Sequence, residues 1–166
     1  MSSILGYGFK YKIEARLPCG QVIEFEDGNL LPQSAVNHNA GLIRGTVAPI
    51  GAWYMGLFEG DFAPTRSVSA ADLPGIVGEF TSYSEAQRPA WQHDYDGVSI
   101  IDNAADRAIF TFTADKIIHG AFICSSPAKG SASGVLLSIA RFAVPRDMPA
   151  GTEFAVTAGI TLIPTV

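Results

Sequence analysis

Charged side chains are scarce in this sequence. Asp, Glu, Lys and Arg make up 16% of its 166 residues, against about 25% in an average soluble protein. The formal net charge is −5, and no stretch gathers the Lys and Arg side chains that phosphate binding requires, so we expect no nucleic-acid partner. No apolar run approaches the ~18 residues of a membrane-spanning helix, and the first residues lack the basic and apolar regions of a signal peptide. We therefore expect synthesis in a cytoplasm and no membrane partner.

Motifs that carry catalysis or bind metals are missing as well. The sequence has no G-x-S-x-G, no P-loop, no dinucleotide fingerprint and no H-E-x-x-H. Cys19 and Cys124 are far apart and fit no metal-ligand spacing, so both are expected to be reduced. Asp94, Asp96 and Gly97 resemble a fragment of a calcium loop that lacks its remaining ligands, which favours a plain turn. We expect no catalytic residue, no cofactor and no metal, and therefore no enzyme.

The histidines stand apart from any plausible nucleophile or carboxylate cluster. His38 lies among polar residues of a predicted helix, and we expect it to face solvent or to cap that helix. His119 lies in an apolar stretch, where a hydrogen-bonded core residue is expected rather than an acid or a base.

Hydrophobic residues, at 48% of the sequence, suffice for one domain over residues 1–166. Apolar and charged residues alternate over 9–17, which predicts an N-terminal hairpin over 9–26. Residues 98–163 predict the C-terminal strands, including a hairpin of 98–101 with 107–113 and a turn that begins at Pro145. This pattern predicts an all-β fold, an antiparallel β-sandwich, jelly roll or barrel with one or two short helices.

Two stretches interrupt the strands. Residues 32–43 predict a short helix that begins near Pro32 and carries Leu42 and Ile43 on its apolar face. The apolar strand 52–58 is followed by an excursion over 59–78, and a loop of this length in a compact domain is typical of a contact-making element.

The segment 79–91 has the composition of a structural anchor. Tyr83 and Trp91 supply aromatic rings that bury well. Arg88 has a planar fork that can bind carbonyls or a carboxylate, and Pro89 fixes the backbone before the next strand. We expect these side chains to hold the loop to the sandwich.

Packing and turn motifs recur in a fixed order along nearly the whole chain. They are Gly28-Asn29-Leu30 with Pro32, Trp53-Tyr54 with Gly56-Leu57, Glu79 through Tyr83 with Arg88, Pro89 and Trp91, Asn103-Ala104-Ala105, Phe110-Thr111, Gly120 through Ser125, and Phe142, Pro145-Arg146 and Gly151. In this layout the chain resembles a widespread group of small structural proteins of tailed bacteriophages.

The resemblance implies a virion protein, most of all a capsid decoration or cement protein bound to the outer surface of the major capsid protein shell. A tail, baseplate or fibre component is the alternative, and a glycan-binding module on the host-facing surface is a third. The high hydrophobic share also predicts self-association as a dimer or trimer. The partner-contacting side chains are expected in the N-terminal arm and at the excursion, namely Ile4, Leu5, Tyr7, Phe58, Phe62 and Arg66.

Overall fold

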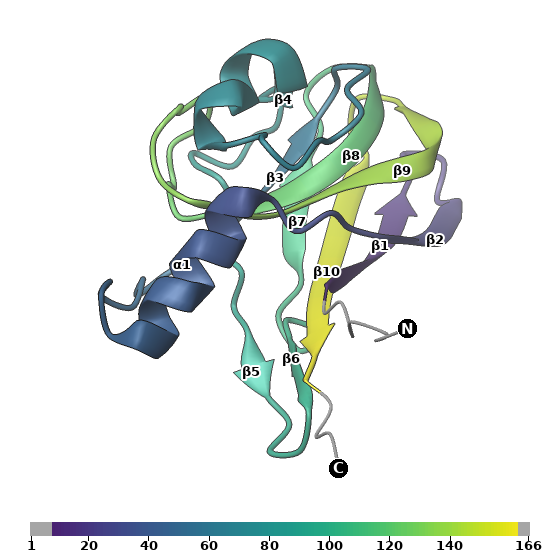
Figure 1. Ribbon diagram of the computed structural model, residues 1–166. Coiled ribbons are helices and arrows are strands. Elements are labelled where there is room, and N and C mark those ends of the chain that lie inside the picture. Colours follow the sequence, from purple (N-terminus) through teal and green to yellow (C-terminus); the bar gives the residue numbers. More distant parts are fainter. Residues whose placement is uncertain (1–7, 163–166) are drawn as a thin grey trace, which may run out of the picture.

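A computed structural model describes residues 8–162 of the chain. Two antiparallel sheets pack against each other and one α-helix lies at their side, so the predicted all-β sandwich is confirmed (Figure 1). The elements are, in order, β1 (Phe9–Arg16), β2 (Val22–Gly28), α1 (Gln33–Arg44), β3 (Tyr54–Phe58), the 3-10 turn η1 (Ala70–Asp72), the π turn η2 (Leu73–Val77), β4 (Glu79–Phe80), β5 (Asp94–Tyr95), β6 (Ile100–Asp102), β7 (Ala108–Thr111), β8 (Lys116–Cys124), β9 (Leu136–Met148) and β10 (Glu153–Thr161).

The first sheet is built around the chain's last strand. Its order is β2-β1-β10-β6-β5, and β7 also pairs with β10. The alternation that predicts the N-terminal hairpin places every second residue of β1 in the interior, from Phe9 to Ala15. β1 pairs with β10 over its full length, from Phe9 opposite Ile160 to Arg16 opposite Glu153.

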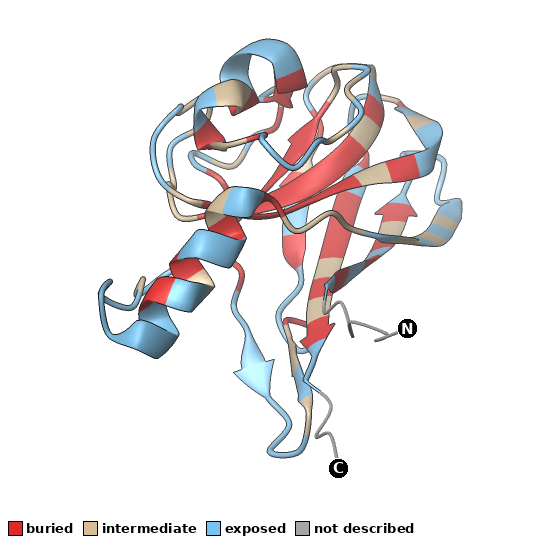
Figure 2. Cartoon of the chain, viewed as in Figure 1, coloured by how far each residue is buried: buried red, intermediate tan, exposed pale blue. Residues whose placement is uncertain are grey.

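The second sheet has the order β4-β3-β8-β9, with the apolar strand β8 in its centre. Glycines in this sheet leave room for aromatic rings that pack directly against the backbone. A Cβ atom at Gly120 would lie 2.1 Å from the Ala140 carbonyl oxygen and 2.2 Å from the Phe58 ring. One hydrophobic cluster fills the space between the sheets and a second lies under residues 58–77, so buried positions concentrate on the strands and exposed ones on α1 and β5 (Figure 2).

The predicted hairpin of 98–101 with 107–113 is wrong in its pairing. β6 and β7 do not pair with each other, because both pair with β10, β6 at residues 159–161 and β7 at residues 153–156. A turn follows β6, where the Asn103 carbonyl accepts the Asp106 amide, and the buried Asn103 side chain ties this turn to β10: it donates to the Val156 carbonyl and accepts from the Ala158 amide.

The predicted turn over 145–151 begins later than expected, since β9 continues to Met148 and the chain turns over 149–152, where the Thr152 amide donates to the Pro149 carbonyl. The ladder with β8 shifts register before this turn: Gly120 lies opposite Arg141, whereas Ile118 lies opposite Arg146. β9 therefore bulges over 142–145, where a proline without an amide hydrogen costs no ladder hydrogen bond.

Two expectations for the helix are wrong as well. His38 is buried, at 9% exposure, with its ring edge-on to the Trp53 ring at 5.7 Å between centroids. Ile43, expected on the buried face, is 89% exposed, because α1 projects beyond the sandwich and only its first turns lie over the sheets (Figure 1). In the described part of the chain, no helix combines the length and the apolar character needed to cross a membrane.

Candidate functional site

The segment 79–91 is organised by a buried ion pair. The Arg88 and Glu79 side chains are 0% and 1% exposed, and their two parallel hydrogen bonds measure 2.8 Å and 2.6 Å. Burial by itself lowers the pKa of Arg88, but the hydrogen bonds and the negative charge of Glu79 leave that pKa above its ordinary value. The guanidinium is therefore charged, and its partner is the carboxylate of Glu79.

The remaining donors of Arg88 hold the small-residue loop 125–134. Its terminal nitrogens donate to the carbonyls of Ser126 at 2.9 Å and Ser131 at 3.0 Å. The Gly130 amide donates to the second oxygen of Glu79 at 3.0 Å. The ion pair thereby fixes the loop backbone at Ser126 and again at Gly130 and Ser131.

The other anchor residues link the two sheets. Lys129 donates to the Tyr83 carbonyl at 2.7 Å and lies 3.9 Å above the Tyr83 ring, and burial raises the pKa of the Tyr83 hydroxyl. The Pro89 carbonyl accepts the Met55 amide of β3. The Trp91 indole donates to the Ala158 carbonyl of β10 at 3.0 Å.

The predicted contact residues differ in how far the structure exposes them. Phe58 is a wrong prediction, because its side chain is fully buried in the second hydrophobic cluster and cannot touch a partner. Phe62 is half-buried against that cluster. Arg66 is exposed, and its carbonyl accepts the Gln33 amide at the start of α1. Ile4, Leu5 and Tyr7 lie outside the described residues.

The excursion 59–78 is held rigidly although it is long. Four of its apolar side chains are buried in the second cluster: Val68, Ala70, Leu73 and Val77. Ser69 and Asp72 form a capping box at η1. A Cβ atom at Gly60 would lie 2.2 Å from the Val77 carbonyl oxygen, so the two ends of the excursion pack backbone to backbone. Ile76, in η2 near the end of the excursion, is 68% exposed.

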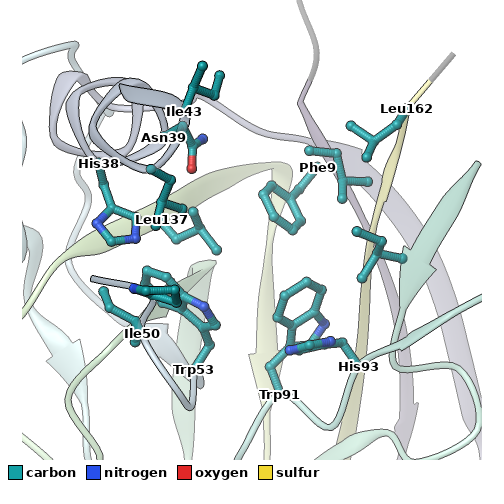
Figure 3. Close-up of a pocket in the computed structure, with 14 residues that line it drawn as sticks. Phe9, His38, Asn39, Ile43, Ile50, Trp53, Trp91, His93, Leu137 and Leu162 are labelled. Atoms are coloured by element: carbon teal, nitrogen blue, oxygen red, sulfur yellow. The ribbon is translucent and has the colours of Figure 1, made fainter. Parts of the chain in front are cut away.

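A groove of about 560 Å³ lies between α1 and the open end of the first sheet. Trp53 and Trp91 stand on opposite sides of it, with Phe9 beside Trp91 and Leu137 on the side of Trp53 and His38, as Figure 3 shows. Its full lining is Phe9, His38, Asn39, Leu42, Ile43, Pro49, Ile50, Trp53, Trp91, His93, Ile101, Leu137, Ile160 and Leu162. Among the residues that the structure describes, the lining contains no Asp, Glu, Lys or Arg, so the groove suits an uncharged apolar group.

Histidines supply the polar groups on either side of this groove. The Nε2 atom of His38 has no hydrogen-bond partner among residues 8–162, and the His93 ring lies on Trp91 at 4.6 Å between centroids. Reasoning from sequence misses this groove. The sequence feature that could have indicated the groove is the apolar pair Leu42 and Ile43. This pair stands at the end of α1, beyond the turns that cover the sheet.

A second hollow, also of about 560 Å³, is charged. Lys116 and Glu59 form an ion pair there at 2.9 Å, and the Nδ1 atom of His119 lies 3.0 Å from the Glu59 carbonyl.

At the tip between β5 and β6, one oxygen of Asp96 accepts the amides of Val98, Ser99 and Ile100, and these hydrogen bonds lower the pKa of Asp96. Within residues 8–162, no group of three or more His, Cys, Asp or Glu is arranged to hold a metal ion.

Comparison of the chain with family models, with curated proteins and with solved structures finds no match.

Proposed function

We propose that this protein is a non-enzymatic structural component of a tailed-bacteriophage virion, a decoration protein that binds the outer surface of the capsid shell. The motif resemblance supports the virion assignment. The residues that carry it, among them Arg88, Trp91, Asn103 and Gly120, form the buried hydrogen bonds and close contacts that fix the sandwich. They act as a scaffold for surfaces that meet a partner.

The proposed binding role rests on the excursion 59–78, which is ordered before any partner binds. A contact loop that is already ordered loses little conformational entropy on binding. This loop buries four apolar side chains of its own and still exposes Ile76 and Arg66; Figure 1 shows its η2 turn at the edge of the sandwich. An exposed aliphatic group and an exposed arginine on one ordered loop suit a protein surface that offers a shallow apolar pocket and an acceptor.

Shell stabilisation then follows from mass action. A protein that binds the assembled shell and not its free subunits lowers the free energy of the assembled state. Many copies act on one shell, so each contact is allowed to be modest in area and affinity.

Co-sedimentation of the purified protein with emptied, undecorated capsids tests this function. We expect binding to saturate at a fixed ratio to the major capsid protein and to raise the temperature at which shells disrupt. The substitution Ile76→Glu places a charge on the exposed side of η2 and is expected to weaken shell binding by about 10-fold or more, on the order of a hot-spot residue.

The matched control is Val144→Glu, because Val144 is 57% exposed on β9 and lies outside the excursion. This control is expected to keep shell binding. Retention on isolated tails with no binding to shells would overturn the decoration role in favour of a tail component. Binding to host glycans with no binding to either particle would overturn both.

A further inference from the structure

We draw no further inference here: the strongest candidate, the apolar groove between α1 and the open end of the first sheet, is an unpartnered surface, and nothing in the structure shows what covers it.

Discussion

Arg88 and His38 are both buried polar side chains, yet their surroundings differ completely. Every guanidinium nitrogen of Arg88 donates, to Glu79, to loop carbonyls and to the Cys124 sulfur. His38 has a ring contact with Trp53 and an Nε2 atom without a hydrogen-bond partner. The first arrangement contributes to the stability of the fold, and the second lowers it.

The surroundings of Arg88 and His38 are typical of two kinds of region in this protein. Around Arg88 the polar groups are satisfied within the chain, so this region needs nothing from outside. Beside α1 an apolar hollow remains open to solvent and lies against an unpartnered polar atom. Proteins tolerate such suboptimal packing where a surface is used for binding. Substitutions that stabilise are therefore expected at the groove and not at the anchor.

The largest expected effect comes from Arg88→Met. It leaves the Glu79 carboxylate buried without its partner and removes the hydrogen bonds to loop 125–134. We expect the free energy of unfolding to fall by about 3–5 kcal/mol, measured by chemical denaturation. In the double variant Arg88→Met/Glu79→Leu no lone charge remains, so part of the loss is expected to return. Equal losses in the single and double variants would contradict a buried ion pair.

Asn103→Ala is expected to cost less. Asn103 is 1% exposed, and its amide joins the turn after β6 to the Val156 and Ala158 backbone of β10 at 3.1 Å and 2.8 Å. Its loss leaves a buried amide and a buried carbonyl unsatisfied, which lowers the free energy of unfolding by about 1–3 kcal/mol. Ala105→Ser, two residues further along an exposed part of the turn, is the control and is expected to stay within about 0.5 kcal/mol of wild type.

His38→Phe is expected to act in the opposite direction. It removes the unpartnered Nε2 atom and keeps a ring of similar shape against Trp53. We expect the free energy of unfolding to rise by about 1 kcal/mol. His93→Phe, at an exposed position on the other side of the groove, is expected to change it little. A fall in stability for His38→Phe would show that Nε2 makes a hydrogen bond in solution.

The periodic parts of the fold follow directly from the sequence. Alternation over β1 predicts its hairpin with β2 and its buried face. The motif after 79 predicts an arginine that binds carbonyls or a carboxylate, and Arg88 makes such bonds. Each of these predictions uses residues close together in the chain, although the loop carbonyls that Arg88 binds are distant from it in the sequence.

Features that depend on distant residues could not be predicted in this way. The pairing of β6 and β7 is decided by a third strand, β10, which offers each of them a separate stretch of backbone. Pro145 is accommodated by a bulge opposite β8. His38 is buried because Trp53 lies across α1, and the groove exists because α1 projects past the first sheet. Sequence periodicity contains no information on such placements.

The last prediction concerns the rates at which the two cysteine thiols react with a labelling reagent, because these rates distinguish the anchor from the groove. Burial raises the pKa of the Cys124 thiol, which is fully buried beside Arg88, whereas Cys19 is exposed. At pH 8 we expect a thiol reagent to label Cys19 rapidly and Cys124 on the order of 100-fold more slowly, because Cys124 reacts only after local opening. Arg88→Met is expected to speed the labelling of Cys124 alone, whereas Ile43→Glu leaves both rates unchanged. Equal acceleration of Cys124 by the two variants would mean that the anchor and the groove open together and that the division drawn between them is wrong.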